Sequence, residues 1–459
     1  MAQAGTDEVD VLVLGGGSGG YACALRASAL GLRVALVEKA ELGGTCLHRG
    51  CIPTKALLHA AEVADAARDG AAIGVNSHVE SIDLAKVHAY QDGVVARLYK
   101  GLQGLVAGHG IEYVAGSGRL ASPTTVQVGE RTITGRHVVL ATGSRPRSLP
   151  GLDIGGRIMT SDEALRLSWM PESVVVLGGG VIGVEFASML RSFGAAVTVV
   201  EALPRLVAGE DPAVSAALTR AFRKRGIVVR TGVAFAGATK TDDAVTITLD
   251  DGATLSADLL LVAVGREPVS GDLGYEQAGV RLDRGYVPTD ERLGTGVPGV
   301  YAVGDLVPGL ALAHRGFAHG IFVAEDIAGR RPAPVRDSGI PRVTYSDPEI
   351  GSVGLTEEQA REVHGEVTTY EYQLGGNGRS QILRTAGFVK VVRAVDGPIV
   401  GVHMIGARMG EQVGEAQLIV GWEALPEDVA PFLHAHPTQN EALGEAHLAL
   451  AGKPLHAHS

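Results

Sequence analysis

Two stretches of the chain are near copies of one another: VDVLVLGGGSGG at residues 9–20 and SVVVLGGGVIGVE at residues 173–185. In each, an apolar, β-rich run leads into G-x-G-x-x-G, and a helix-patterned segment follows. A second apolar run then ends in an acid, Glu38 or Glu201, 21 residues after the middle glycine. The corresponding glycines are Gly15, Gly17 and Gly20 in the first copy and Gly178, Gly180 and Gly183 in the second. Each copy therefore predicts a strand–helix–strand unit.

The repeated motif has the composition of a dinucleotide site. Its first glycine permits a tight turn, its second lets the backbone approach a pyrophosphate, and its third lets helix and strand pack closely. The helix N-terminus offers free N–H groups to the phosphates, and the acid can accept hydrogen bonds from a ribose. One such motif could be an ordinary glycine-rich turn, but two copies with matching acids predict two bound dinucleotides. The carboxylate of Glu201 favours NAD over NADP, although Arg205 nearby leaves some room for a 2′-phosphate.

A pair of cysteines, Cys46 and Cys51, lies in GGTCLHRGCIPTK at residues 43–55, directly after the first unit. An ideal helix separates residues five apart by about 7.5 Å of rise, which exceeds the reach of a disulfide. We therefore expect irregular backbone around Cys46, which the neighbouring glycines permit, and a helix that Cys51 begins or enters. A thiolate near a helix N-terminus has a depressed pKa, and Lys55 follows on the same helix face.

Three interpretations of these cysteines remain open on the residues alone. They could be a buried structural pair, a metal site completed by His48, or a redox pair beside the first dinucleotide site. The glycine surroundings and the position favour the redox pair. The third cysteine, Cys23, has the setting of a small core residue.

Composition excludes several classes of protein. The 459 residues predict about three domains. The net charge of −11 without a basic patch argues against nucleic-acid binding. No apolar run reaches the roughly 18 residues of a membrane span, and the N-terminus lacks the features of a signal peptide, so we expect a cytoplasmic protein without a membrane segment.

The motifs, taken in order, resemble those of the pyridine nucleotide–disulfide oxidoreductases, and within that family most resemble the members that oxidise dihydrolipoamide. Besides the two glycine motifs and the cysteine segment, they are LATGSRP (140–146), VAVGREP (262–268), YAVGDLVPG (301–309) and HAHPTQNEA (434–442). The resemblance implies an α/β fold with two Rossmann-like FAD/NAD(P)-binding domains plus a C-terminal α+β dimerisation domain. It implies an FAD-binding domain over 1–150 and 271–340, an NAD-binding domain over 151–270 and a dimerisation domain over 341–459, with 331–335 as a linker.

The resemblance also assigns roles to single residues. Cys51 would lie against the flavin as the charge-transfer thiolate, and Cys46 would be the interchange thiol. His436 would take the proton of the substrate thiol, and Glu441 would orient its imidazole. Lys55 would sit beside the flavin ring, paired with Glu185. The residues expected to bind FAD or NAD are Gly15, Gly17, Gly20, Glu38, Lys39, Gly44, Thr45, Lys55, Thr142, Gly143, Ser144, Gly304, Asp305, Ala313, His314, Gly178, Gly180, Gly183, Glu201 and Gly265.

The implied reaction is the oxidation of protein-bound dihydrolipoamide to lipoamide with reduction of NAD, through FAD and a Cys46–Cys51 disulfide and without a resident metal ion. The implied partners are a second copy of the chain, which supplies the base, and a lipoylated acyltransferase or lipoyl-carrier protein of a 2-oxo acid dehydrogenase complex. Alternatives are another NAD(P)H-dependent disulfide reductase of the family, an NADH oxidase, and an FAD-binding scaffold subunit without dithiol turnover. The sequence departs from common family forms at His48 and Arg49 and at Gln439 and Asn440, which we interpret as tuning near the disulfide and the base.

Overall fold

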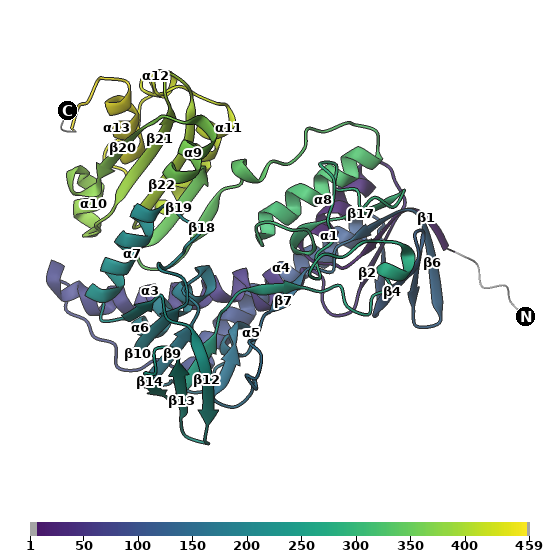
Figure 1. The fold of residues 1–459 in the computed structure, drawn as a ribbon, viewed down its shortest axis with the longest axis horizontal. Coiled ribbons are helices and arrows are strands. Elements are labelled where there is room, and N and C mark those ends of the chain that lie inside the picture. Colours follow the sequence, from purple (N-terminus) through teal and green to yellow (C-terminus); the bar gives the residue numbers. More distant parts are fainter. Residues whose placement is uncertain (1–6, 457–459) are drawn as a thin grey trace, which may run out of the picture. The chain divides into compact units, whose positions relative to one another are not determined.

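A computed structural model describes residues 7–456 of the chain, which form two compact units (Figure 1). The first unit comprises the described residues of Met1–Leu57, Asp83–Arg147 and Arg266–Asp337. The second comprises those of Leu58–Ile82, Ser148–Gly265 and Ser338–Ser459. The chain thus passes between the units several times, and each unit is described by itself below.

The first unit is built on a sheet whose parallel strands are ordered β3-β2-β1-β6, with β17 also parallel to β6. Along β1, Val11 and Val13 belong to one hydrophobic cluster and Leu12 and Leu14 to another, so both faces of the strand are buried, as in most parallel sheets. Strands β5 and β4 extend the sheet in antiparallel fashion. The bounds are β1 (Asp7–Leu14), β2 (Val34–Glu38), β3 (Glu112–Ala115), β4 (Gly118–Ser122), β5 (Thr125–Val128), β6 (Arg131–Leu140) and β17 (Val300–Ala302).

Helices α1 (Ser18–Ala29) and α8 (Ala313–Ile327) of the first unit pack closely against each other. Their approach needs glycine, because a Cβ on Gly320 would lie 2.2 Å from the carbonyl oxygen of Gly19. The long helix α4 (Leu84–Gly108) contributes Val95, Leu102 and Val106 to the same core. Ala313 begins the helix that follows the YAVGD motif.

The second unit contains a parallel sheet with strand order β11-β10-β9-β15-β8. Strand β9, helix α6 (Val181–Phe193) and strand β10 follow one another in this copy of the repeat, as β1, α1 and β2 do in the first copy. The bounds are β8 (Ile158–Thr160), β9 (Ser173–Leu177), β10 (Ala196–Glu201), β11 (Val228–Thr231) and β15 (Leu259–Val262), with the antiparallel strands β12 (Phe235–Lys240), β13 (Val245–Leu249) and β14 (Thr254–Ala257) nearby in sequence. The two Rossmann-like units predicted from the repeat are therefore confirmed.

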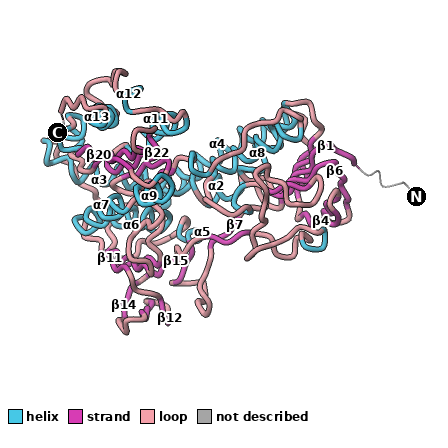
Figure 2. The backbone as a smooth tube through the Cα atoms, turned by 45° about the horizontal axis from the view of Figure 1, so that its top comes forward, coloured by secondary structure: helices cyan, strands magenta, loops and turns pink. Residues whose placement is uncertain are grey.

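The C-terminal part of the second unit is an antiparallel sheet, ordered β18-β19-β22-β21-β20 and drawn in green to yellow in Figure 1. Helices α11 (Met409–Gly421) and α13 (Glu441–Leu450) pack on one face through residues such as Met409 and Leu443 (Figure 2). The strands are β18 (Arg342–Thr344), β19 (Glu349–Gly354), β20 (Val367–Gln373), β21 (Phe388–Ala394) and β22 (Ile399–Gly406). The predicted α+β character of this region is confirmed.

The remaining elements are short connectors and covering helices. They are α2 (Gly44–Arg49), α3 (Cys51–Asp69), α5 (Ser161–Ala164), α7 (Pro212–Lys224), α9 (Glu357–His364), α10 (Gly378–Leu383), α12 (Pro426–Val429), β7 (Ser144–Pro146), β16 (Arg266–Pro268) and the 3₁₀ turns η1 (Gly70–Ile73), η2 (Glu276–Ala278), η3 (Gly304–Leu306), η4 (Asp337–Gly339) and η5 (Leu374–Gly376). No helix within residues 7–456 is long and apolar enough to cross a membrane.

A polar row crosses the other face of the antiparallel sheet. The row crosses four strands, and each of its residues pairs with the next one on the neighbouring strand: Arg342, Ser352, His403 and Lys390. Two acids at the start of α7 meet this row. Glu210 accepts hydrogen bonds from Arg342 and Ser352, and Asp211 from the ammonium of Lys390 at 2.9 and 3.0 Å. The row therefore anchors α7, a helix that belongs to the second Rossmann-like region, to the antiparallel sheet.

Charge pairing decides the ionisation of Asp211, whose side chain is fully buried. Burial alone would raise its pKa, but hydrogen bonds from Lys390 and from the backbone N–H groups of Ala213 and Glu357 outweigh that effect and lower the pKa. Removing the cation while leaving the carboxylate should therefore be costly.

We predict that Lys390→Met lowers the free energy of unfolding by about 3–5 kcal/mol, because Asp211 is left buried without a cation. The measurement is urea unfolding followed by circular dichroism. A matched control is Arg361→Met, which removes a partly exposed ion pair to Glu357 and should cost about 0.2–1 kcal/mol. Equal losses in the two variants would contradict the role given to the buried pair.

Candidate active site

The two glycine turns have the same geometry. A Cβ on Gly20 would lie 1.8 Å from the carbonyl oxygen of Gly15, and one on Gly183 would lie 1.9 Å from that of Gly178. No larger residue fits at either position, because real Cβ atoms do not approach a backbone oxygen so closely. The third glycine of each motif thus lets helix and turn pack as the sequence predicted.

The middle glycines face open space. Apart from atoms of the adjoining residues in the chain, no heavy atom lies within 4 Å of a Cβ added at Gly17 or Gly180. Both residues also precede a helix N-terminus, and neither α1 nor α6 receives a side-chain cap there. The first N–H groups of each helix are therefore available to an anion, and a pyrophosphate fits the donor set of both turns.

The two acids take up equivalent positions beside their turns. Glu38 Oε2 accepts the N–H of Gly16 at 2.6 Å, and Glu201 Oε2 accepts the N–H of Gly179 at 2.6 Å. The second oxygen of each accepts the N–H two residues further along the chain, at 2.8 and 2.7 Å. Each carboxylate is thus held at the end of its strand, and its remaining lone pairs can accept ribose hydroxyls. These backbone donors were not anticipated from the sequence.

The cysteine segment is held against the first glycine turn. Gly43 donates its N–H to the carbonyl oxygen of Gly16 at 2.8 Å, and a Cβ on Gly44 would lie 2.7 Å from the α-carbon of Gly17. Gly43 and Gly44 both have positive φ, at 101° and 56°. The contact of α2 with the turn therefore depends on these two glycines.

The expectation of irregular backbone around Cys46 is wrong, because Cys46 lies within the short helix α2. The break falls instead at Gly50, whose φ of −148° and ψ of −114° separate α2 from α3. Cys51 is the first residue of α3, as predicted, and the side chains of Cys46 and Cys51 are hydrogen bonded to each other. Neither cysteine is in a disulfide in this structure, so it presents the pair as a dithiol.

When this dithiol loses one proton, the remaining proton stays on Cys46. Its pKa is raised well above the ordinary value, first because its thiol is hydrogen bonded to Cys51 and second because it is buried. The positive charge of Lys55 opposes this shift. Tyr21 of α1, which the sequence did not single out, lies close enough to respond: burial and then Cys46 raise its pKa to about 12. The arrangement suits a pair in which Cys51 bears the negative charge.

Other predicted flavin-site residues meet in the first unit. Ser144 donates its hydroxyl to Asp305 at 2.6 Å and accepts a hydrogen bond from Arg266, a residue that the sequence did not single out. Thr142 hydrogen bonds to the hydroxyl of Tyr275 at 2.9 Å. Gly143 and Gly304 have φ of 69° in both cases, which suits glycine at the turns after β6 and β17. Lys39 and His314 are exposed, and Thr45 and Ala313 are half-buried. Gly265, which belongs to the second unit, is also exposed.

The predicted base and its acid are adjacent in the second unit. His436 Nδ1 lies 2.7 Å from Glu441 Oε1, and the other carboxylate oxygen accepts the N–H of Thr438 at 2.7 Å. Burial opposes ionisation of Glu441, but these two hydrogen bonds lower its pKa overall. Because an ionised carboxylate only accepts, Nδ1 of His436 donates, which leaves Nε2 to act as a base. The imidazole is 77% exposed and so is accessible to a partner or substrate.

The residues that depart from the common family pattern support the loop that bears His436. Gln439 is buried, accepts the hydroxyl of Ser380 at 2.6 Å and donates to the carbonyl oxygen of Ala407 at 2.7 Å. Asn440 donates to Glu415, whose other oxygen lies 2.8 Å from His434. His434 is thus a structural residue.

Near the cysteines, His48 hydrogen bonds to the carbonyl oxygen of Leu42 and lies edge-on to Tyr99, which fixes α2 in the first unit. Arg49 is exposed at the end of α2. Glu185 belongs to the second unit, where it is buried and accepts the N–H of Tyr345 at 2.9 Å. Its pairing with Lys55 stays a prediction.

Comparison with known proteins agrees with this geometry. The family described as pyridine nucleotide-disulphide oxidoreductase matches residues 9–320, and its dimerisation domain matches residues 340–447. Dihydrolipoyl dehydrogenase of Bacillus subtilis is 40% identical, over 98% of this chain and 99% of its own length. The leghemoglobin reductase of Vigna unguiculata is 38% identical, over 99% of this chain and 90% of its own.

Solved structures have the same fold over almost the whole chain. LpdA of Mycobacterium tuberculosis is 25% identical with a TM-score of 0.90, covering 97% of this chain and 100% of its own. The HOCl-induced flavoprotein disulfide reductase RclA of Escherichia coli, as its copper(II) complex, is 24% identical with a TM-score of 0.87, covering 97% and 100%. Members of the family bind FAD and a nicotinamide dinucleotide. The chain therefore belongs to the pyridine nucleotide-disulphide oxidoreductase family, as an FAD-dependent oxidoreductase with a C-terminal dimerisation domain.

Proposed function

We propose that this enzyme oxidises protein-bound dihydrolipoamide to lipoamide and reduces NAD to NADH. The observation that carries the proposal is the hydrogen-bonded pair of Cys46 and Cys51, held by Gly43 and Gly44 against the first glycine turn. The substrate is inferred from relatives about 40% identical over nearly the whole chain that are named dihydrolipoyl dehydrogenase. The dithiol would be presented by a lipoylated acyltransferase or lipoyl-carrier protein of a 2-oxo acid dehydrogenase complex, in the cytoplasm.

FAD is assigned to the first glycine turn and NAD to the second. Both turns offer uncapped helix N-termini, an open middle glycine and a fixed carboxylate, which together fit a dinucleotide. Bound FAD would supply the redox chemistry that links the dithiol to the nicotinamide. Preference for NAD over NADP is assigned to Glu201, because its carboxylate repels a 2′-phosphate.

Thiol–disulfide exchange accounts for the roles of the two cysteines. A substrate thiolate would attack the sulfur of Cys46 in the oxidised pair, forming a mixed disulfide and releasing Cys51 as a thiolate. The second substrate thiolate would then attack the substrate sulfur of that mixed disulfide, which releases lipoamide and leaves Cys46 to take up a proton. The raised pKa of Cys46 favours this end state, with the proton on Cys46 and the charge on Cys51.

A base is required because free thiols are mostly protonated at neutral pH. We assign the removal of the thiol proton to Nε2 of His436, while Glu441 accepts the hydrogen bond from Nδ1. Both residues lie within the matched dimerisation domain, residues 340–447, which supports a homodimer. We propose that the partner subunit's His436 serves each dithiol, so that the active site is complete only in the dimer.

We predict that Cys51→Ser abolishes dihydrolipoamide oxidation, because the exchange then has no second sulfur, while NADH-to-dye transfer continues. Steady-state assays with dihydrolipoamide and NAD, and with NADH and a dye, measure the two activities. Cys23→Ala is the matched control, since Cys23 is buried in the core and should leave both activities near wild type. Dihydrolipoamide turnover in Cys51→Ser would overturn the proposed function.

We predict that His436→Gln lowers kcat/KM for dihydrolipoamide by about 10²–10⁴-fold, which is the usual contribution of a general base. NADH-to-dye transfer should not change, because it needs no thiol proton. His456→Gln is the control, because His456 is also exposed and paired with a glutamate but lies near the C-terminus. Loss of both activities, or of neither, in His436→Gln would be evidence against the assignment.

The repeat provides a matched pair of variants for the cofactor assignment. We predict that Glu201→Gln weakens NAD binding about tenfold or more, because the loss of a charged acceptor costs about 1.5–3 kcal/mol. Its flavin content should remain as in wild type. Glu38→Gln should have the opposite pattern, with less retained FAD and unchanged NAD affinity in the flavin-loaded fraction. Flavin absorbance after gel filtration measures the retained FAD, and titration with NAD measures its affinity. The reverse pattern in the two variants would mean that FAD binds at the second turn and NAD at the first.

A further inference from the structure

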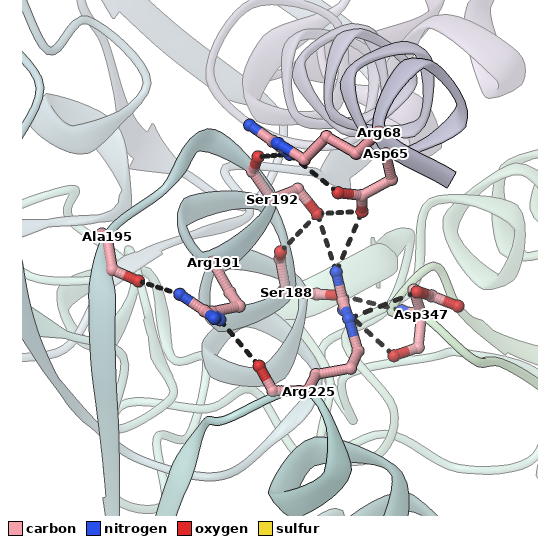
Figure 3. Close-up of polar contacts among 8 residues, drawn as sticks. All are labelled: Asp65, Arg68, Ser188, Arg191, Ser192, Ala195, Arg225 and Asp347. Carbon is pink, nitrogen blue, oxygen red and sulfur yellow. Dashed lines mark hydrogen bonds and ion pairs between the residues drawn. The ribbon is translucent and has the colours of Figure 1, made fainter. Parts of the chain in front are cut away.

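Arg225, at the C-cap of α7, is surrounded by acceptors (Figure 3). Nη1 donates to Ser188 Oγ at 2.6 Å and to the carbonyl oxygen of Asp347 at 3.2 Å, and Nε lies 3.3 Å from Asp347 Oδ2. Nη2 donates to Ser192 Oγ at 2.7 Å and to Asp65 Oδ2 at 3.0 Å. A guanidinium has five N–H donors in a fixed plane, and here five acceptors meet it.

These acceptors come from three separate segments of the second unit. Ser188 and Ser192 lie one turn apart on α6, where both are buried, and Asp65 lies on α3. Ser192 also hydrogen bonds to Asp65, and its carbonyl oxygen accepts a hydrogen bond from Arg68 of α3. Asp347 returns a backbone N–H to Ser188 at 2.9 Å. Arg225 is therefore the centre of a network that fixes α3 against α6.

Both helices begin at a residue to which the proposed function assigns a role. α6 begins directly after Gly180, the open middle glycine of the second turn. α3 begins at Cys51 and continues without interruption to Asp69, so the residues that Arg225 holds are on the helix that bears the thiol. A small shift of either helix along its axis would change the network and move the other helix.

We infer that Arg225 is a positioning residue that couples occupancy of the second glycine turn to the reactivity of the Cys51 thiol. The inference rests on the proposed function, in which NAD binds at Gly180 and Cys51 is the reacting thiol. Binding of a pyrophosphate at the N-terminus of α6 draws this helix toward the ligand. The guanidinium of Arg225, which is bonded to both helices, transmits the shift to α3. Lysine cannot replace arginine here. Its ammonium has three donors on a single nitrogen, whereas the five acceptors surround the plane of the guanidinium.

The test compares the reduced dimeric enzyme with and without ADP-ribose, by following alkylation of Cys51 with iodoacetamide and mass spectrometry. ADP-ribose carries the pyrophosphate but no nicotinamide, so it cannot oxidise the dithiol. In the wild type, ADP-ribose should change the alkylation rate about fivefold or more, which is the lower range of coupling between sites. In Arg225→Gln and Arg225→Lys the change should fall below about twofold. Arg223→Gln, which alters an exposed arginine two residues earlier on α7, should keep the wild-type response.

Ser192→Ala is a milder variant that keeps the guanidinium and removes its link to Asp65 through the hydroxyl. It should also weaken the coupling, while flavin content and thermal midpoint stay near wild type. Full coupling in Arg225→Gln would overturn the inference, because the response would then reach the thiol by a route that does not need the guanidinium. Absence of coupling in the wild type would overturn it too, whereas absence of dihydrolipoamide turnover in the wild type would instead refute the proposed function.

Discussion

A contact between backbone atoms at the first glycine turn determines how the redox site is built. Helix α1 can begin where it does because Gly20 has no Cβ to collide with the carbonyl oxygen of Gly15. The turn then receives the cysteine segment, through the bond from Gly43 to Gly16. The position of α2, and with it of the Cys46 sulfur, thus follows from the turn that also has the donors for a pyrophosphate. One steric constraint places a thiol and a cofactor site side by side in the same unit.

Features that depend on short stretches of sequence could be predicted well. The repeat determined both parallel sheets, because the glycine spacing and apolar runs leave few alternatives for a strand–helix–strand unit. The backbone break between the cysteines was harder to locate. Spacing excludes one continuous helix through Cys46 and Cys51, but several glycines could interrupt it. The structure places the break at Gly50 and keeps Cys46 helical, which only the docking of α2 against the turn could decide.

Features that depend on distant partners could not be read from the sequence. In the run FVKVVRAV, Lys390 looks like a solvent-facing residue between apolar neighbours, since alternation predicts a face but not what covers it. In the structure its side chain is 9% exposed and binds Asp211, 179 positions earlier. Arg225 gave no signal either, because its five acceptors come from segments that no local pattern connects. His436 and Glu441, only five positions apart, could be anticipated as a pair because their motif resembles that of the family.

The anchors of α7 explain why the second dinucleotide-binding region and the antiparallel sheet form one compact unit. At its start, Glu210 and Asp211 bind the polar row of the sheet, and at its end Arg225 binds Asp347, just before β19. The 13 residues of α7 separate these anchors by about 20 Å. A helix fixed at one end can pivot, but one fixed at both ends by charged hydrogen bonds cannot do so without breaking one set. A shift of α6 or α3 should therefore be followed by the side chain of Arg225, while α7 itself stays in place.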